Sequence, residues 1–404
     1  EAKKYTDDNT TNALIGKVSG KLLHVEDAWP GKPLSLTIGG AYKQDGTPSP
    51  ENPVPIEVIE NPIVKVTGRN LLDTDKGLNN CLVKNADGTY TLTKVSDRER
   101  FSGGIPFCVP KGSKIYISDA LSKENLSGKV SVLLDYQDGT TRTFGFYPHA
   151  ISPFFEQNSV QSIKLYVEGS VETGSSFVFL PQLEYGTEAT AYAPYVGTST
   201  LFTLPTEHPY LAALPDGTCD EIIINSVGNV SLVARVARSD MPNVVSVASE
   251  SNQLGGDGTI NRLIAFGPIA DARVANGGTG LCTRFPNAGN KKNRDTVRFG
   301  ASNNILYLYT SNEDIIGNST KPSIDAWFVE HRTSIVYPLA TPVTYPLGKL
   351  TIPSLPETIS NVWTDAELTT DMSMTYKRDV NAVIAGLTAQ IAALKGTISN
   401  DELP

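Results

Sequence analysis

The last stretch of the chain carries the clearest hydrophobic pattern. Between positions 380 and 398, apolar residues recur at alternating steps of four and three, which is the a/d spacing of a coiled-coil seam. A helix with so short and narrow an apolar stripe is marginally stable alone. We therefore predict an oligomerisation helix that pairs with another copy of itself; packing on its own domain is the alternative. The seam residues are Val380, Ile384, Leu387, Ile391, Leu394 and Ile398.

Most of the remaining chain alternates between apolar and polar positions and predicts strands. Between positions 70 and 196, the dipeptides Asp87-Gly88 and Asp138-Gly139 each separate two alternating runs. Dipeptides of this kind favour the tight turns of β-hairpins. Several short strands at regular spacing over such a segment are typical of a β-sandwich.

A second strand-rich module follows, and the pattern predicts one short helix within it, capped by Ser323, with Ile324, Trp327 and Phe328 on one face. The fold class is therefore mostly β, with two sandwich or jelly-roll-like modules between two terminal helices. The predicted domains are an N-terminal attachment helix (1–20), a Pro-rich β connector (21–69), a carbohydrate-binding-like β-sandwich (70–196), the second β module (197–376) and the oligomerisation helix (377–404).

Composition and charge narrow the class of protein. The net charge of −9 disfavours nucleic acid as a partner. No stretch has the length and apolarity of a membrane-spanning helix, so membrane insertion is not expected. The four cysteines are far apart and form no CxxC pair, which predicts buried free thiols rather than a metal site or a disulfide framework. Because the chain starts at Glu1 rather than Met, we expect that residues precede it.

The sequence contains no familiar catalytic signature. The Gly-x-Ser-x-Gly, HExxH and P-loop patterns are absent, so we expect no catalytic residues, no cofactor and no metal. The groups Asp216/Asp220/Glu221 and Asp365/Glu367 have the residue types of a glycosidase pair, but the pattern favours residues of turns and strand ends. The histidines are isolated in sequence and predict surface or capping residues; they are His24, His149, His208 and His331.

Aromatic rings and carboxylates near one predicted turn form the best candidate for a binding site. Tyr136 and Tyr147 lie beside turns of the first sandwich, close to Asp135 and Asp138. Lectin-like sites place aromatic faces against sugar rings and carboxylates against sugar hydroxyls. We therefore take these four residues as glycan-binding candidates. Alternating aromatics in a sandwich also describe a packed core, which is the competing interpretation.

A cluster of basic residues interrupts the acidic chain. The segment from Arg262 to Arg298 contains seven basic residues and two acidic ones, which gives a local charge of +5. Lys291, Lys292 and Arg294 lie in the polar run NAGNKKNRD, which predicts an exposed loop. The loop is a candidate for contact with an anionic cell-wall polymer; a solvated hairpin tip, or a charge pair with a neighbouring subunit, is the alternative.

Several stretches carry a resemblance to known proteins. The run QDGTPSPENPVPI followed by KVTGRNLL, the unit VYPLATPVTYPLG and the ending MTYKRDVNAVIAGLTAQIAAL resemble elements of tail proteins from phages and prophages of Gram-positive gut bacteria. The piece from GRNLL to PQLEYGTEATAYAPY is similar to the carbohydrate-binding jelly rolls set into such fibres.

The resemblance implies a tail fibre or receptor-binding (minor tail) protein, usually a homotrimer. Its partners would be other tail or baseplate proteins and host cell-surface polysaccharide. It would be made in the bacterial cytoplasm, carried in the virion tail and active outside the host cell. Ile or Val at a with Leu at d favours dimers in isolated coiled coils, but we expect a trimer because the large β modules outweigh so short a seam. A tail spike that depolymerises glycan and a purely structural tail spacer remain as alternatives.

Overall fold

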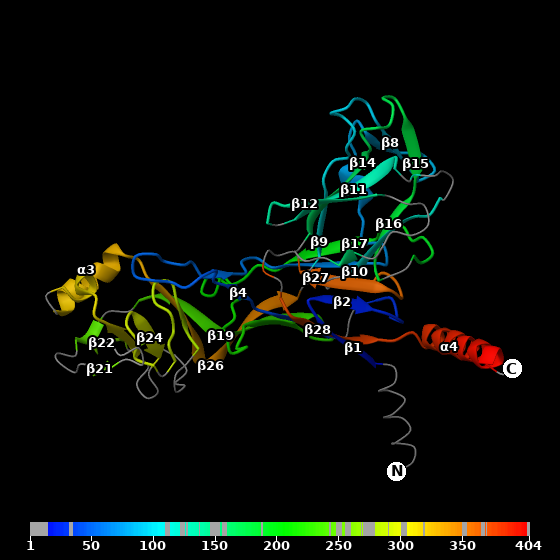
Figure 1. The fold of residues 1–404 in the computed structure, drawn as a ribbon. Coiled ribbons are helices and arrows are strands. Elements are labelled where there is room, and N and C mark those ends of the chain that lie inside the picture. Colours follow the sequence, from blue (N-terminus) through cyan, green and yellow to red (C-terminus); the bar gives the residue numbers. More distant parts are fainter. Residues whose placement is uncertain are drawn as a thin grey trace, which may run out of the picture. The chain divides into compact units, whose positions relative to one another are not determined.

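The chain is described by a computed structural model. The residues that it describes are 15–31, 35–109, 114–121, 126, 128–136, 138–145, 154–155, 160–186, 189–241, 244–247, 253–254, 260–267, 269, 279–289, 291–299, 305–317, 320–349, 354–364, 368 and 370–401. Antiparallel sheets dominate, which confirms the predicted β-rich class. The chain divides into two compact units (Figure 1): unit 1 comprises Glu1–Leu36, Ile63–Leu201 and Thr351–Pro404, and unit 2 comprises Thr37–Pro62 and Phe202–Leu350.

Unit 1 brings both ends of the chain together through strand pairing. The strand β1 (Ile15–Gly20) pairs antiparallel with β28 (Met372–Lys377). A separate four-stranded sheet has the order β17-β6-β27-β2. Its strands are β2 (Leu22–Val25), β6 (Ile63–Thr67), β17 (Gly197–Leu201) and β27 (Ser360–Thr364).

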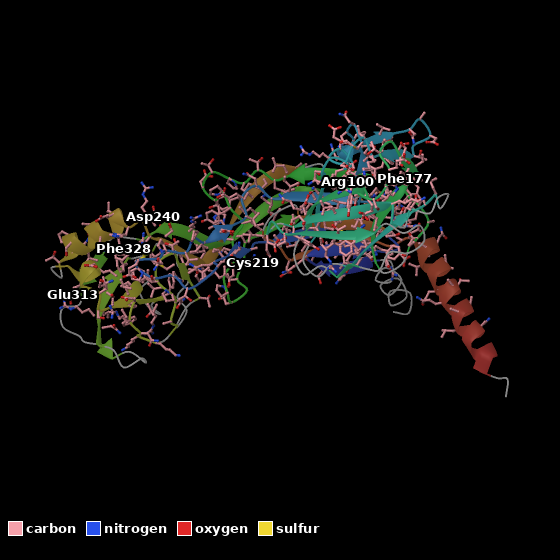
Figure 2. All side chains as sticks on the ribbon, turned by 45° about the horizontal axis from the view of Figure 1, so that its top comes forward. Arg100, Phe177, Cys219, Asp240, Glu313 and Phe328 are labelled. Atoms are coloured by element: carbon pink, nitrogen blue, oxygen red, sulfur yellow. The ribbon has the colours of Figure 1, made fainter. Side chains whose placement is uncertain are left out.

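The segment 70–196 of unit 1 contains three antiparallel sheets, with the orders β12-β11-β14-β9, β13-β10-β16 and β15-β8-β7. Within this segment, the guanidinium carbon of Arg100 (labelled in Figure 2) lies 5.2 Å from the centroid of the Phe101 ring. The elements are η1 (Thr74–Gly77), β7 (Leu82–Lys84), β8 (Tyr90–Thr93), β9 (Ile105–Val109), β10 (Lys114–Asp119), β11 (Val130–Tyr136), β12 (Thr141–Gly145), β13 (Phe154–Phe155), β14 (Val160–Val167), β15 (Ser176–Phe179) and β16 (Pro181–Tyr185).

Both predicted hairpin turns of this segment are confirmed. Gly88 connects β7 to β8 with a φ of 85°, and Gly139 connects β11 to β12 with a φ of 81°. Glycine adopts a positive φ without steric cost. Asp138 completes its turn by accepting hydrogen bonds from the backbone N–H and the hydroxyl of Thr140.

Unit 2 is organised around the antiparallel pairing of two long strands, β19 (Asn229–Asp240) and β26 (Ser334–Lys349). Together with β18 (Glu221–Ile224) and β23 (Leu281–Cys282), they follow the order β18-β19-β26-β23. The other elements are β3 (Ser35–Gly39, across the unit boundary), β4 (Tyr42–Lys43), β5 (Glu57–Val58), β20 (Val244–Val247), β21 (Gln253–Leu254), β22 (Ile260–Phe266), β24 (Thr296–Phe299), β25 (Leu306–Thr310), α2 (Glu313–Ile316) and α3 (Lys321–Glu330).

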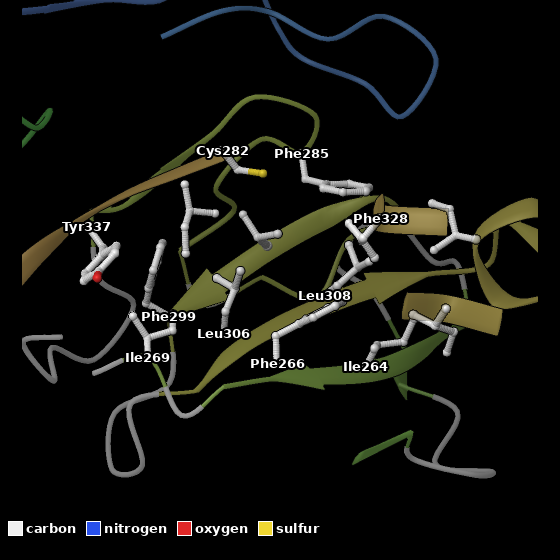
Figure 3. Close-up of a cluster of buried hydrophobic side chains, with 14 residues drawn as sticks. Ile264, Phe266, Ile269, Cys282, Phe285, Phe299, Leu306, Leu308, Phe328 and Tyr337 are labelled. Carbon is white, nitrogen blue, oxygen red and sulfur yellow. The ribbon is translucent and has the colours of Figure 1, made fainter. Parts of the chain in front are cut away.

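A hydrophobic core lies where α3 packs on the sheet β20-β22-β25-β24 (Figure 3). Phe328 of α3 meets Phe266 of β22 edge-on, with ring centroids 4.9 Å apart. The predicted helix is therefore confirmed, together with its apolar face. Its predicted cap is wrong: the N-cap is Thr320, and the hydroxyl of Ser323 donates instead to the carbonyl of Thr320.

The predicted N-terminal helix is wrong over the part that the structure describes. Residues 15–20 form β1, and residues 1–14 of that prediction lie outside the described residues. The reason is tertiary: an added Cβ at Gly16 would lie 2.2 Å from the Tyr376 ring of β28. The glycine therefore permits a close strand pairing with a segment at the other end of the chain, and no local pattern contains that information.

The final element, α4 (Val380–Asp401), is a continuous helix that follows β28 almost directly (Figure 1). This confirms a helix at the predicted position. The described apolar seam residues from Val380 to Leu394 are 41–63% exposed. The side chain of Ile398 lies outside the described part.

Candidate functional site

One candidate site is a hollow of about 520 Å³ in the 70–196 segment, which we call the sheet pocket. Strand register builds it, because Thr141, Asp135, Ser162 and Pro106 stand opposite one another on β12, β11, β14 and β9. Side chains directly opposite in an antiparallel sheet share one face. The lining residues are Gly104, Pro106, Asp135, Tyr136, Gly139, Thr140, Thr141, Gln161, Ser162 and Lys164.

Asp135 is the central polar group of the sheet pocket. Its Oδ2 accepts a hydrogen bond from the Ser162 hydroxyl at 2.6 Å and lies 3.0 Å from the Lys164 ammonium nitrogen. Burial raises the pKa of Asp135, but the hydrogen bonds from Ser162 and Lys164 together outweigh it and leave the pKa below its ordinary value. The carboxylate is therefore ionised across the neutral range.

Two of the four glycan-binding candidates, Asp135 and Tyr136, lie together in this pocket. Tyr136 is only 7% exposed and continues the row of core residues formed by Val132 and Leu134 along β11, so it presents little ring surface to a ligand. Asp138 is not among the lining residues, and Tyr147 lies outside the described residues.

Ser162 and Lys164 line the sheet pocket but were not among the candidates chosen from the sequence. They sit two positions apart on β14, so they project from the same side of that strand. The alternation in QSIKLYVEG indicates that these two side chains share a side of the strand, since Ile163 lies between them and Leu165 follows Lys164. The pairing register with β11 is the part that no local pattern provides.

The basic residues of the NAGNKKNRD run lie between β23 and β24 in unit 2. Lys291 and Arg294 are exposed, and Arg294 forms an ion pair with Asp295 at 3.3 Å. The backbone carbonyl of Lys292 accepts a hydrogen bond from the buried side-chain amide of Asn261 at 2.8 Å. The loop is thus anchored through its backbone while its charges face solvent.

If this loop contacts an anionic polymer, reversing Lys291, Lys292 and Arg294 to Glu should lower adsorption to Gram-positive cells and flatten its dependence on salt. Exposed charges are screened over about 8–10 Å near physiological ionic strength. The measurement is adsorption of the purified chain to cells at low and high salt. Equal adsorption by the triple variant at low salt would assign the loop to the solvated-tip interpretation.

The carboxylates that have the residue types of a glycosidase pair make hydrogen bonds or ion pairs within the chain where the structure describes them. Asp220 is fully buried and accepts four hydrogen bonds, one of them from His208 at 2.9 Å. Glu221 forms an ion pair with Arg235 at 2.6 Å, and Asp216 accepts from the backbone of Thr218. Asp365 and Glu367 lie outside the described residues.

The histidine prediction is wrong for His208, which is 4% exposed; its ring contacts that of Tyr210 at a tilt of 48°, with ring centroids 4.2 Å apart. Burial raises the pKa of the neighbouring Tyr210 to about 12. His331 fits its prediction, because it is the C-cap residue of α3 and its ring nitrogen lies 2.9 Å from the Trp327 carbonyl. His24 is partly buried, and its Nδ1 lies 2.8 Å from Oδ1 of Asn361; His149 lies outside the described residues.

Three cysteines, Cys81, Cys219 and Cys282, are free thiols, and Cys81 and Cys282 are buried. Burial raises the pKa of Cys282 to about 11, so this thiol is unreactive at neutral pH. Within the described residues, no group of three His, Cys, Asp or Glu side chains has the geometry to hold a metal ion. No helix in the described part of the chain is long and apolar enough to cross a membrane.

Comparison with other proteins adds no homologue. No protein-family model, curated protein or solved structure matches this chain.

Proposed function

We propose that the chain is a tail fibre or receptor-binding protein of a phage or prophage of Gram-positive bacteria. On this proposal the 70–196 segment is a jelly-roll-like module that attaches to a host cell-surface glycan through the sheet pocket, and α4 joins the chains into a homotrimer. The resemblance of the three sequence stretches supports the biological context. The geometry of the sheet pocket supports the binding mode.

The observation that carries the binding proposal is the polar row on the sheet. The Asp135 carboxylate lies 2.6 Å from the Ser162 hydroxyl oxygen and 3.0 Å from the Lys164 ammonium nitrogen. Sugar hydroxyls both donate and accept, so a mixed row of this kind matches a polyol better than an apolar ligand. Because sheet strands hold these side chains in place, little ordering free energy would be lost on binding.

The composition of the pocket favours binding over cleavage. Asp135 is the one carboxylate among the described residues that line it. Glycoside hydrolysis generally needs two carboxyl groups, spaced about 5–5.5 Å or about 6.5–9.5 Å apart. In addition, the lowered pKa of Asp135 makes it a poor general acid.

Self-association is supported by the exposed seam of α4. Within the single chain, the five described seam residues remain 41–63% exposed. Exposed apolar side chains at a/d spacing can be buried by the same seam in another copy. A trimer would also raise the avidity of three weak glycan sites.

The proposed function is tested by incubating the full chain with wall polysaccharides, teichoic acids and peptidoglycan from a panel of Gram-positive bacteria. Retention without a change in polymer size supports the adhesin. A fall in polymer size would replace it with the depolymerase, and absence of both would replace it with the structural spacer. Light scattering of the same sample measures the number of chains per particle.

The sheet pocket gives a specific prediction. Lys164→Ala should weaken glycan retention at least about tenfold, because one charge-assisted hydrogen bond contributes about 1.5–3 kcal/mol. Lys164 is partly exposed, so its loss should leave the melting temperature nearly unchanged. The measurement is retention of the best polymer from the panel.

The matched control is Lys21→Ala, which removes an exposed lysine outside the pocket and should have no effect. Binding by the unmodified chain should also stay constant between about pH 8 and pH 5, because Asp135 keeps its charge there. Equal losses in both lysine variants, or a fall in binding over this pH range, would contradict the assignment of the sheet pocket.

A further inference from the structure

A second hollow of about 280 Å³ lies elsewhere in the 70–196 segment, and we call it the tyrosine pocket. It differs from the sheet pocket in having three tyrosines and three aspartates in its wall. Its lining residues are Asp73, Thr74, Asp75, Lys84, Asp87, Gly88, Tyr90, Leu180, Tyr192, Pro194 and Tyr195.

Buried polar side chains hold the wall that carries Tyr192 and Tyr195. Glu184, which is 2% exposed, accepts hydrogen bonds from the backbone N–H of Thr190 at 3.0 Å and from its hydroxyl at 2.6 Å. The Gln182 side-chain oxygen accepts from the N–H of Ala193 at 2.7 Å. The run 190–195 is therefore fixed by β16 and is not a free loop.

The same run is held from its other side by the residues that follow β6. The Asn70 side-chain amide donates to the Ala193 carbonyl at 3.1 Å, and the Arg69 guanidinium donates to the Ala191 carbonyl at 3.2 Å. The GRNLL and PQLEYGTEATAYAPY stretches, distant in sequence, thus meet in space. Together the two stretches fix the backbone that carries Tyr192 and Tyr195.

Another part of the lining is a hydrogen-bonded cluster around Asp75. Its Oδ1 accepts from the Tyr90 hydroxyl at 2.6 Å, and its Oδ2 accepts from the Lys84 ammonium at 2.8 Å. The hydrogen bonds from Lys84 and Tyr90 lower the pKa of Asp75. The Lys84 ammonium also lies 5.7 Å from the centroid of the Tyr90 ring, so this wall already accommodates a cation beside an aromatic ring and a carboxylate.

The remaining charge in the tyrosine pocket is negative. Three aspartates and one lysine give the lining a formal charge of −2. Lys84 is committed to Asp75, whereas Asp73 makes no side-chain capping bond to η1, at whose N-terminus it stands. A negative pocket with aromatic walls attracts cations and repels carboxylates and phosphates.

We propose that the tyrosine pocket is a second saccharide site, selective for a sugar that carries a protonated amine. The rings of Tyr192 and Tyr195 would contact the C–H face of the sugar, and Asp73 would receive its ammonium group. This site is separate from the sheet pocket and does not depend on the proposed role in host attachment. With both proposed sites, the module would have one site for a neutral polyol and another for a cationic sugar.

The experiment compares three monosaccharides of nearly equal size, namely glucosamine, glucose and glucuronate. Saturation-transfer NMR on the full chain suits weak ligands and large particles. At about pH 6 the amine of glucosamine is protonated. We expect glucosamine to bind about threefold to tenfold more tightly than glucose, because its ammonium group would meet the Asp73 carboxylate, and glucuronate to bind least, because the negative lining repels its carboxylate.

Variants locate the binding. Tyr192→Ala removes a ring that is 37% exposed, so the fold should persist while glucosamine saturation transfer is lost; Tyr192→Phe should retain most of it. Gly197→Ala tests the same wall without deleting a ring, since its Cβ would lie 2.2 Å from the Tyr195 hydroxyl oxygen and displace that side chain. We expect a loss of binding in this variant as well.

Two controls make the result decisive. Trp29→Ala removes an exposed aromatic ring outside the pocket, and Lys164→Ala alters the sheet pocket; both should leave glucosamine binding intact. Equal affinity for glucosamine and glucose would overturn the proposal. So would retention of glucosamine binding in Tyr192→Ala. Neither result would affect the sheet-pocket test, because that test reads out polymer retention through Lys164.

Discussion

If α4 joins the chains as proposed, replacing Ile384 and Ile391 with Asn is expected to dissociate the assembly into single folded chains. Both residues occupy a positions of the α4 seam and are 56% and 53% exposed in the single chain. Full burial of such a side chain contributes about 1.5–3 kcal/mol. Each Asn would remove this gain and add an unpaired polar group to the interface. The free-energy cost of two substitutions per chain should therefore exceed the free energy of association of so short a seam.

The matched control places Asn at Ala382 and Ala389, which have the same seven-residue spacing on the face opposite the seam. Asn costs more helix propensity in place of Ala than in place of Ile. A general loss of helicity would therefore make the control the worse variant. We expect the control to keep the mass of the oligomer by light scattering and the seam variant to give the mass of one chain. Unchanged mass in the seam variant would remove α4 from the assembly.

Local chemistry allowed the sequence to predict the turns and helices. Gly88 and Gly139 occupy turn positions with positive φ, and their neighbouring aspartates bond to the turn backbone. The apolar stripe of α4 is regular enough to be recognised from the sequence alone. In each case the determining residues are within a few positions of one another.

The wrong prediction of an N-terminal helix arose because strand pairing between residues far apart in sequence sets the structure there. The strand β1 reads as a polar helix, but its conformation is set by β28, where Ile15 faces Lys377. The two compact units are discontinuous in sequence, because residues 37–62 join unit 2 before the chain returns to unit 1. No boundary defined along the sequence alone reproduces such an exchange. The domain boundaries drawn from the sequence remain a prediction.

In the two pockets as well, the sequence indicates residues with a local signal but not those that long-range strand pairing brings to the site. Asp135 was identifiable because it is a carboxylate beside a turn, whereas its partners Ser162 and Lys164 depend on the β11–β14 register. The tyrosine pocket was missed because Tyr90 and Tyr192 come from segments about a hundred positions apart. Its sequence signal was present in the polar residues of GRNLL and PQLEYG, since Asn70, Gln182 and Glu184 are buried and bind backbone groups.

Asp220→Ala is expected to be the most destabilising single substitution in unit 2. The Oδ1 of Asp220 accepts from the backbone N–H groups of Arg235 at 2.8 Å and Val236 at 2.9 Å. These two groups lie at an irregularity in the register of β19 with β26. The Oδ2 accepts from the N–H of Ala212 and from the His208 ring, each at 2.9 Å. The carboxylate therefore supplies acceptors where the β ladder is interrupted.

Deleting this carboxylate would leave three backbone N–H groups without an acceptor around a side chain that is 0% exposed. Each buried donor without a partner costs about 1–3 kcal/mol, so the expected loss for the three donors is about 3–9 kcal/mol. Folded domains are stable by only about 5–15 kcal/mol. The variant should therefore show a strongly lowered melting temperature by calorimetry, or fail to fold. Asp220→Asn keeps one side-chain oxygen and should fall between the variant and the original chain.

Glu221→Ala is the matched control, because it removes the adjacent carboxylate, which is partly exposed and forms an ion pair with Arg235. A pair of that kind contributes about 0–1 kcal/mol, so the melting temperature should change little. The comparison also separates a structural carboxylate from a catalytic one. A catalytic Asp220 would give a variant that melts like the original chain and has lost a glycan-cleaving activity. That outcome would overturn the structural assignment and restore the depolymerase, whereas a large loss of stability in Asp220→Ala alone supports a purely structural role at the strand irregularity.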